Sequence, residues 1–340
     1  MPSTSCTFLL LLFLAPAMAF GQVPDGEPAP EQSAAATQSH AGESVIRITI
    51  DNDIIAPHAG RPDDHDYTHG TRLLLSFAGV PGWAHRLTGN ASACLSAEAR
   101  RVGCIAGTLE LGQEIYTPRI DGFEPVPGER PYTGWLYVSP GVHHISDTRV
   151  RSIRLLVGVT GPASLGEKAQ DGIHSLLGEH ERRGWRNQLR SEVGVAVAYD
   201  DRHVVERAVG GGVGAIALGW GAIAGNVRTA LHFDALARIG LRSNRAWSPD
   251  ELEVRTPMRL YAIAGFRQEL VVRDLFVDGN TFHESVHAER IPVVRDFVLG
   301  FGMRREAFAM EYRWVQRGRE YEAQPRAHAW GSLAFVFYRD

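Results

Sequence analysis

The chain has 340 residues and a formal net charge of −4, and 44% of its residues are hydrophobic and 22% are charged. A mean hydropathy of −0.15 is too polar for a bundle of membrane-spanning helices, and the hydrophobic fraction is too high for a disordered chain. A pI near 6.4 provides no overall basic field for nucleic acid. Composition alone therefore indicates a soluble globular protein, a class that the order of the residues contradicts.

The first 43 residues resemble an export signal followed by a tail. Phe8 to Phe20 is an apolar run too short to span a ~30 Å membrane core, which needs about 20 helical residues. Its end, Ala17-Met18-Ala19, matches a small-x-small cleavage pattern, so residues 1–19 are predicted to be a secretory signal peptide. Residues 20–43, rich in Pro, Ala, Gln, Ser and Gly, are predicted to be disordered.

Removal of the signal peptide also removes Cys6 and leaves one pair of cysteines, Cys94 and Cys104. An even pair in an exported protein indicates an oxidising compartment and a disulfide that closes a short loop. Two unpaired thiols are the alternative.

Alternation of apolar and other side chains dominates the mature chain. In the clearest run, Phe308, Met310, Tyr312 and Trp314 alternate with small or charged residues. Period two is typical of β-strands with unlike faces. Other runs of this kind occur around residues 46–50, 72–77, 152–159, 193–199 and 333–337.

Roughly twelve to fourteen such runs of about ten residues fill the chain to its end, bounded by turn residues. The second face carries Gly, Ala, Ser or a single Arg or Glu, which suits a barrel with lipid outside and a crowded polar interior. We therefore predict an all-β, transmembrane antiparallel β-barrel over residues 44–340. A secreted β-sandwich is the soluble alternative.

One segment breaks this period. Ser164 and Glu167 have the spacing of a capping box, which predicts a helix from Leu165 to Leu177. Gln170 and His174 lie four residues apart and therefore project from one face of that helix.

His283-Glu284-Ser285-Val286-His287 matches the H-E-x-x-H pattern of zinc proteases, which functions only on a helix. Asp278-Gly279-Asn280 before it predicts a hairpin turn, so we place the motif on a strand. There the two histidines would be about 13 Å apart, too far to share one zinc ion. The match is interpreted as chance.

Two other motifs are also rejected. Residues 161–166 lack the G-x-S-x-G spacing of a hydrolase nucleophile, and Ser164 is interpreted as a helix cap. Residues 51–53 resemble the start of a calcium loop, but Ala56 and Pro62 occupy positions where an EF-hand needs Gly and Glu. Oxygen ligands for a hard cation at a strand end stay possible.

Seven further stretches carry a family pattern when they are taken together and in order. They are IDNDIIAP (50–57), DYTHGTRL (66–73), LGQEIYTPRI (111–120), ERPYTGWLYVS (129–139), GVTGPASLGEKAQDGIHSLLGE (158–179), GWRNQLRSEVG (184–194) and VDGNTFHESV (277–286). With them, the chain from about residue 44 to its end resembles the outer-membrane lipid A 3-O-deacylase family (LpxR-type).

The resemblance implies a barrel of about twelve strands, with the short helix in an extracellular loop and an active site between that helix and the barrel wall. It implies an esterase of the Gram-negative outer membrane that removes the 3′-linked acyloxyacyl group from lipid A of lipopolysaccharide. We expect a monomer surrounded by outer-membrane lipids, with no nucleic acid partner.

Roles follow from the matching motifs. The resemblance implies that His174 is the base that activates water, that Gln170 orients the water or His174, and that Asn52 supports the site. Arg130 and Tyr132 would bind the anionic headgroup of the substrate.

The family is calcium-dependent, and Asp53 and Thr68 match its metal-holding positions. An acidic residue after the helix would complete the shell. Glu179 and Glu181 both fit that description, and we take Glu181 as the ligand. The Ca²⁺ ion would polarise the ester carbonyl.

Two other functions remain open on the sequence. An outer-membrane phospholipase would use a Ser-His pair, for which we find no suitable flanking residues. A porin or structural barrel would need neither a helix carrying Gln170 and His174 nor the Asn52-Asp53 pair.

Overall fold

The computed structural model describes residues 44–56, 65–80, 92–95, 97–177, 182–243 and 252–339. The predicted signal peptide (1–19) and the predicted tail (20–43) lie outside the described residues, as do Glu179 and Glu181. Within the described ranges, no helix is both long and apolar enough to cross a membrane.

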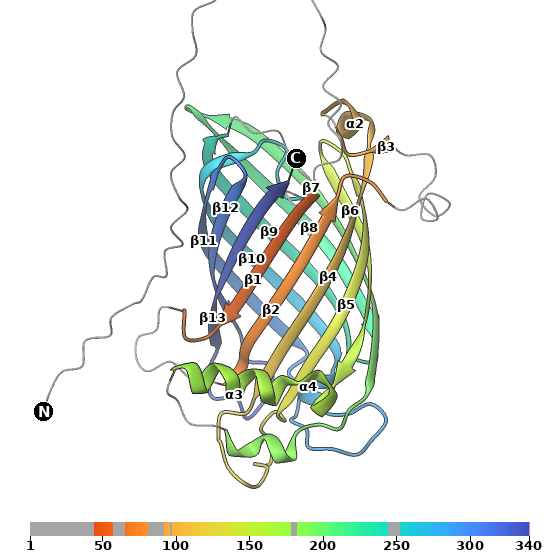
Figure 1. Cartoon of the computed structure of the whole chain (residues 1–340), viewed down its shortest axis with the longest axis vertical. Helices are drawn as coiled ribbons and strands as arrows, with labels where there is room; N and C mark the ends of the chain where they lie inside the picture. The colour runs from red at the N-terminus through yellow and green to blue at the C-terminus, as the bar shows by residue number, and fades with distance from the viewer. Residues whose placement is uncertain are drawn as a thin grey trace, which may run out of the picture. The chain divides into compact units, whose positions relative to one another are not determined.

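Antiparallel strands dominate the structure (Figure 1). The strands are β1 (Ser44–Asn52), β2 (Asp66–Phe77), β3 (Ser92–Ala93), β4 (Cys104–Thr117), β5 (Thr133–Ile145), β6 (Arg149–Thr160), β7 (Val193–Val209), β8 (Gly212–Gly225), β9 (Arg228–Arg242), β10 (Met258–Asp274), β11 (Val293–Arg305), β12 (Phe308–Arg317) and β13 (His328–Arg339). The helices are α2 (Ala97–Val102), η1 (Gly161–Ser164), α3 (Gly166–Leu177), η2 (Arg183–Asn187) and α4 (Leu275–Asp278).

All strands except β3 form one closed ring of twelve. Each strand pairs with its neighbours along the chain, β2 pairs directly with β4, and β1 pairs with β13 to close the sheet. The short β3 pairs in parallel with the start of β4. The predicted antiparallel barrel of about twelve strands is therefore confirmed.

Side chains alternate between the outside of the barrel and its interior. On β7, Val193, Val195 and Val197 are 62%, 43% and 49% exposed, whereas the alternating Ala196 and Ala198 are buried. This pattern arises when one face of a strand meets lipid and the other meets a crowded lumen. It explains why small residues occupy the second face of the predicted strands.

Ion pairs connect strands across the lumen. Glu311 of β12 accepts hydrogen bonds from Arg47 of β1 (3.1 Å), Arg238 of β9 (3.3 Å) and Arg313 of its own strand (2.6 Å). Charges removed from water cost free energy unless they are paired and hydrogen-bonded. The pairing of Glu311 with arginines from three strands therefore makes its buried charge tolerable and links those strands.

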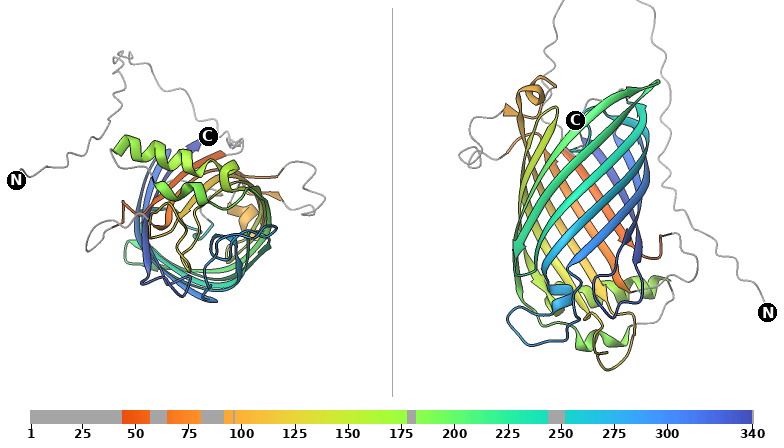
Figure 2. Two further views of the ribbon diagram at one scale, coloured as in Figure 1. Left: turned by 90° about the horizontal axis from the view of Figure 1, so that it is seen from below. Right: turned by 180° about the vertical axis from the view of Figure 1, so that it is seen from behind.

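The two ends of the barrel carry different connections. Ser44 pairs with Arg339, so both ends of the described chain lie at one end of the barrel. Long connections that include α3 lie at the opposite end (Figures 1 and 2). Bacterial outer-membrane barrels have short periplasmic turns and longer extracellular loops, so we take the end with α3 as the extracellular end.

The predicted helix is present with a shifted start. Leu165 takes a left-handed conformation (φ 60°) and separates η1 from α3, which begins at Gly166. The Ser164 hydroxyl donates to the Gly161 carbonyl oxygen (2.6 Å) and accepts from the Gly166 N–H (3.4 Å). Ser164 thus joins two helices, and the Glu167 carboxylate accepts from Gln188 instead.

Cys94 and Cys104 form the predicted disulfide. The bond joins the segment before α2 to the first residue of β4, at the end of the barrel that carries the termini.

The placement of His283–His287 on a strand is wrong. The short helix α4 precedes the motif where a hairpin turn was predicted, and residues 284–289 form a loop. Side chains satisfy this backbone: Glu192 accepts from the N–H groups of Thr281 and Phe282, and the Ser285 hydroxyl accepts from the N–H of Asn280. A sheet partner is therefore not needed here.

Candidate active site on the outer wall

The first part of the site lies where β1 ends and β2 begins. The Asn52 side-chain nitrogen donates to the backbone oxygen of Thr68 (3.3 Å), and its Oδ1 accepts from the N–H of Ile54 (2.8 Å). The register between β2 and β4 shifts between Tyr67 and His69, which marks a β-bulge at Thr68. A bulge changes the direction of a side chain locally. Here Tyr67 faces the lumen and Thr68 faces the outside of the barrel.

Thr68 faces the outer side of the wall together with Thr117, the last residue of β4. Their hydroxyl oxygens are 2.7 Å apart, and both side chains are buried. Asp53, which directly follows Asn52, is also fully buried. Polar groups on the outside of a barrel are shielded only if another element covers them.

The helix α3 is that cover. Ile115, two residues before Thr117 on the same face of β4, is 0% exposed, whereas the outward-facing Leu111 is 52% exposed. Ile115 packs with Tyr132 and Trp185, and Ala169 of α3 lies against this cluster. Figure 2 shows α3 across the rim of the barrel, so the helix replaces lipid over this part of the wall.

Close contacts fix the helix on the wall. Gln113 of β4 donates from Nε2 to the carbonyl oxygen of Ser164 (2.7 Å). A Cβ atom at Gly134 of β5 would lie 2.2 Å from the Ser164 Oγ and 3.0 Å from the Gly166 Cα. Only glycine permits this approach, so the sequence of β5 sets how closely the helix is seated.

Gln170 and His174 lie on the covered face of α3, as their spacing predicted. They are 2% and 4% exposed, and the Trp185 indole donates from Nε1 to the Gln170 Oε1 (2.7 Å). Both views of the barrel show the C-terminal part of α3 beside the ends of β1 and β2 (Figures 1 and 2), and His174 is in the last turn. The structure therefore brings Asn52, Asp53 and Thr68 to the same part of the wall as the helix.

Arg130 is buried and does not lie at an open rim of the barrel. Its guanidinium is 0% exposed and lies 3.2 Å from a Glu320 carboxylate oxygen and 3.5 Å from an Asp66 carboxylate oxygen. Tyr116 and Tyr321 lie beside it, with ring centroids 5.0 Å and 5.9 Å away. A substrate headgroup would reach Arg130 only if this cluster opened, so its assignment to substrate binding stays a prediction.

Electrostatics in this cluster favour the charged forms. Burial alone would lower the pKa of the Arg130 guanidinium, but the carboxylates of Glu320 and Asp66 outweigh burial and raise it. Burial alone would raise the pKa of Glu320, but Arg130 and Arg317 hold it below its usual range. The loop that contains Glu320 is therefore joined by buried charge to the loop that contains Arg130.

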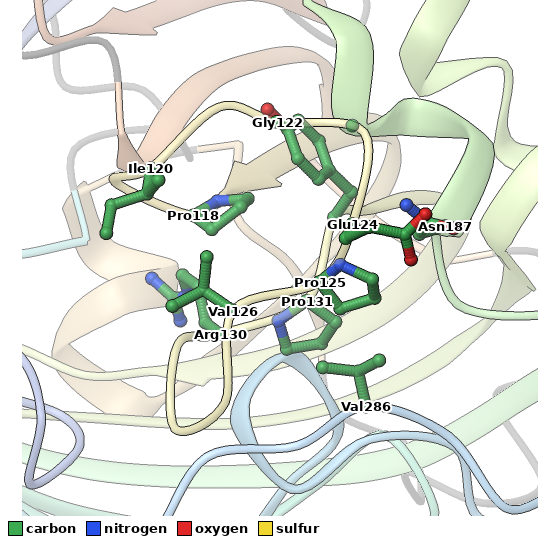
Figure 3. Close-up of a pocket in the computed structure, with 12 residues that line it drawn as sticks. Pro118, Ile120, Gly122, Glu124, Pro125, Val126, Arg130, Pro131, Asn187 and Val286 are labelled. Atoms are coloured by element: carbon green, nitrogen blue, oxygen red, sulfur yellow. The ribbon is translucent and has the colours of Figure 1, made fainter.

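Tyr132 lies closer to the helix than Arg130 does. Its hydroxyl donates to Asp121 (2.8 Å), and its ring packs against Trp185 with centroids 5.2 Å apart. On its other side is a cavity of ≈ 20 Å³ among Pro118, Pro131 and Val286 (Figure 3). That space holds about one water molecule, so it is too small for an acyl chain.

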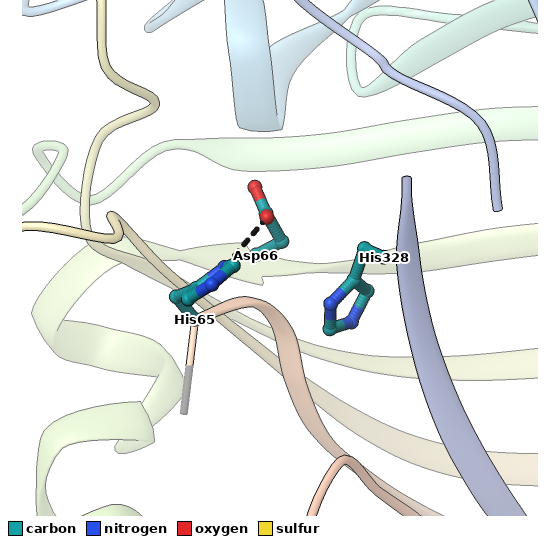
Figure 4. A group of neighbouring side chains, drawn as sticks. All are labelled: His65, Asp66 and His328. Atoms are coloured by element: carbon teal, nitrogen blue, oxygen red, sulfur yellow. Dashed lines mark hydrogen bonds and ion pairs between the residues drawn. The ribbon is translucent and has the colours of Figure 1, made fainter. Parts of the chain in front are cut away.

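A cluster of His65, Asp66 and His328 has ligand atoms within 4.8 Å of one another, and no other such trio occurs in the described ranges (Figure 4). Asp66 already accepts from His65 (2.7 Å), Tyr321 (3.1 Å) and Gln324 (3.1 Å), and the Arg130 cation is its neighbour. A carboxylate saturated with donors beside a cation is a poor metal ligand. We interpret the trio as a structural clamp at the start of β2.

The predicted calcium ligands fit a hard cation in their chemistry. Asp53 supplies a carboxylate and Thr68 supplies a hydroxyl, and Ca²⁺ prefers oxygen donors of this kind. Both are buried at neighbouring positions of the wall, and Glu181 lies outside the described residues. The two described ligands are therefore suited to calcium, and the presence of the ion stays a prediction.

The sequence motifs assign no role to Trp185 and Thr117, although both lie in stretches that carry the family resemblance. Trp185 fixes the amide of Gln170, and Thr117 bonds to Thr68. No local pattern signals either contact, because the two partners are 15 and 49 residues apart and meet only in the folded structure. The only sign in the sequence of such a contact is that a single Trp, Trp185, follows the predicted helix.

The closed barrel, its apolar outer belt and the loop helix over its wall define an outer-membrane β-barrel protein. The model of the family "Outer membrane protein LpxR" matches residues 8–339, and the chain belongs to this family.

One solved structure supports this fold. The structure of LpxR from Salmonella typhimurium aligns with a TM-score of 0.68 at 16% identity, over 86% of this chain and 99% of that chain. The β domain of the Bordetella autotransporter BrkA aligns with a TM-score of 0.43 at 10% identity, over 88% of this chain and 99% of that chain, too distant to support an argument. None of the curated proteins matches this sequence.

Proposed function

We propose that this protein is a lipid A 3-O-deacylase that hydrolyses the ester of the 3′-linked acyloxyacyl group at the outer wall of the barrel. The observation that carries the proposal is the burial of Gln170 and His174 between α3 and the wall, beside the strand ends that hold Asn52, Asp53 and Thr68. A site on the outside of the barrel meets lipids directly, which suits a substrate anchored in the outer leaflet.

His174 acts as the general base. A neutral imidazole has one ring nitrogen free to accept a proton from water. The water oxygen attacks the ester carbonyl carbon, and its proton passes to the imidazole nitrogen. When the tetrahedral intermediate collapses, the sugar oxygen leaves and takes that proton back, so the products are the free acyloxyacyl acid and a 3′-hydroxyl.

Gln170 holds the water or the imidazole in place. Its Oε1 accepts from the Trp185 indole, so the amide nitrogen at the other end of the side chain acts as a donor. A donor beside the base orients the attacking water by its lone pair. Trp185 is thus a positioning residue that acts through Gln170.

Asp53 and Thr68 would hold Ca²⁺, which when bound supplies Lewis-acid polarisation of the ester carbonyl. Asn52 fixes the strand end that carries Asp53, since its amide bonds both to Thr68 and to the backbone beyond Asp53. A hydrolase of this kind needs no serine nucleophile, consistent with the absence of a nucleophile motif from the sequence.

Mass spectrometry of lipid A and phospholipids from cells that express the protein tests the proposal. Loss of the mass of the 3′ acyloxyacyl unit supports deacylation. Unchanged lipid A with altered phospholipids would identify a phospholipase instead. If both lipid pools stay unchanged while folded protein is in the membrane, the porin or structural alternative gains support.

A further inference from the structure

The lumen of this barrel is not filled by side chains alone. It contains one cavity of ≈ 480 Å³ towards the extracellular end and a second of ≈ 310 Å³. Glu110, Arg154, Arg267 and Arg313 line both cavities, so the two spaces adjoin. A barrel of twelve strands is wide enough to hold water in its lumen. Such a barrel is a pore unless both ends of the lumen are closed.

Aromatic side chains close the extracellular end. Tyr116 of β4 stacks on Phe276 of α4 with ring centroids 4.2 Å apart, and Trp330 of β13 packs in the same buried cluster. Phe276 comes from a loop that turns inwards, so this end is closed by a loop as well as by the wall.

The periplasmic end is closed by a different element. The hairpin between β7 and β8 turns there in two residues, Gly210 and Gly211, as is usual for that end. The connection between β9 and β10 is much longer, from Arg242 to Met258. Its described part, residues 252–257, returns to the barrel mouth, where Leu252 and Glu253 line the second cavity. We call residues 252–257 the stopper.

Glu253 anchors the stopper inside the lumen. Its carboxylate accepts from Arg238 (2.6 Å) and lies 3.6 Å from both Arg202 and Arg313. Burial alone would raise the pKa of Glu253, but these arginines hold it below its usual range. The three arginines come from β9, β7 and β12, so one acidic side chain of the loop engages three parts of the wall.

The backbone of the stopper is also held. Glu206 of β7 accepts from the N–H groups of Arg255 and Thr256 and from the Thr256 hydroxyl (3.0 Å). Arg100 of α2 donates to the carbonyl oxygen of Arg255 (3.1 Å). A surface turn needs no such set of bonds, so the stopper is built to stay in place.

Apolar contacts complete the seal. Val254 is buried with Val213, Ala215 and Met258. Leu252 packs against the cluster around the Cys94–Cys104 disulfide. The disulfide loop therefore supports the stopper from the side.

We propose that the stopper seals the periplasmic mouth of the lumen, so that the barrel is a closed chamber and not a pore. The inference is independent of the proposed deacylation. Removing Glu253 would take one negative charge away from Arg202, Arg238 and Arg313, which keep Asp234 and Glu311 as partners. The opened mouth would therefore be more positive and would admit anions in preference to cations.

The test uses a thiol reporter in the second cavity, at Ser152, whose side chain lines that cavity and is buried. In the full-length Ser152→Cys protein, the thiol is reacted with a negatively charged methanethiosulfonate, which forms a mixed disulfide and releases a sulfinate. The unchanged chain serves as the blank for any other thiol. We expect slow labelling with the stopper intact and labelling faster by about tenfold or more after Glu253→Ala, because opening becomes more frequent.

Glu98→Ala is the matched control, since Glu98 is an acidic residue of α2 at the same end and its side chain is 74% exposed. It should leave the labelling rate unchanged. If Glu253→Ala does not fold, Glu206→Ala removes the acceptor of the Arg255 and Thr256 N–H groups instead and should also accelerate labelling. Rapid labelling with the stopper intact, or an unchanged rate in the folded Glu253 or Glu206 variant, would overturn the proposal.

Discussion

Polar groups are buried in two regions of this barrel, the lumen and the outer wall beneath α3, and the two regions hold them differently. In the lumen, carboxylates face arginines from several strands, as Glu311 does with Arg47, Arg238 and Arg313. Beneath α3, the bonds that hold the site join uncharged groups, such as Thr68 with Thr117 and Trp185 with Gln170.

The difference indicates which region stabilises the barrel and which region can catalyse a reaction. A saturated ion-pair network stabilises the barrel but offers a substrate no group whose protonation can change easily. The outer wall instead presents an imidazole, an amide, hydroxyls and a carboxylate next to the lipid phase. We therefore locate catalysis on the outer wall and assign the lumen to stability, and the following predictions test that division.

The largest effect is expected at His174. His174→Ala removes the proposed base and should lower the rate of fatty acid release from lipid A micelles by about 10²–10⁴-fold. The folded barrel should persist, because the imidazole belongs to a loop helix. His283→Ala, in the loop after α4, is the control and should keep its activity; equal losses in both variants would remove the special role of His174.

Arg130 is held by buried ion pairs, as the arginines of the lumen are. Arg130→Met leaves Glu320 and Asp66 with less compensation and should lower the free energy of unfolding by about 3–5 kcal/mol. The matched Arg119→Met removes a pair with Glu129 in which the arginine side chain is 42% exposed, so we expect a smaller loss, about 1 kcal/mol. A stable Arg130→Met protein with a raised KM for lipid A would instead support the predicted substrate contact.

The same cluster predicts a pH effect. The pKa of Glu320 is lowered in the folded state, so its contribution to stability is present above the ordinary carboxyl pKa and is lost as the pH falls towards the lower folded value. Acid unfolding of the wild type should therefore be more sensitive to pH than that of Glu320→Gln. Identical acid-unfolding curves for the two proteins would contradict this.

Asp53 tests the metal. Excess chelator should stop fatty acid release, and added Ca²⁺ should restore it. Asp53→Asn should reduce the rate by about 10²-fold, because a Lewis acid contributes several kcal/mol to stabilising the transition state. Activity that survives both treatments would exclude the metal-assisted mechanism.

The smallest effect is expected at Trp185. Trp185→Phe keeps most of the packing against Tyr132 but removes the hydrogen bond to Gln170, and kcat should fall about tenfold. KM should change little, since Trp185 acts through Gln170. A changed KM at constant kcat would assign Trp185 to substrate binding.

Much of the fold followed from the sequence, because period two is a local signal. The alternation around residues 193–199 and 308–314 predicted strands that the structure contains, and the helix with Gln170 and His174 was found within one residue of its start. The prediction of a strand around His283 is wrong because no local pattern shows how this backbone is bonded. The side chains of Glu192 and Ser285 accept its hydrogen bonds in place of a neighbouring strand.

The site was only partly predictable. Family motifs pointed to the strand ends and the helix, but the burial of Arg130 depends on Glu320, which is 190 residues away in the sequence. The bulge at Thr68 likewise depends on the pairing of β2 with β4, and the bond from Trp185 to Gln170 depends on how the connection between β6 and β7 folds. A single sequence displays neither kind of tertiary contact.

The most direct test of the division between wall and lumen compares two variants by the lipid A mass spectrum of cells that express them. His174→Ala alters the outer wall, and Arg154→Gln alters a side chain that lines both lumen cavities. The account predicts that the 3′ acyloxyacyl unit is retained with His174→Ala and removed with Arg154→Gln, as with the wild type. Loss of product with Arg154→Gln and normal product with His174→Ala, both folded, would contradict it.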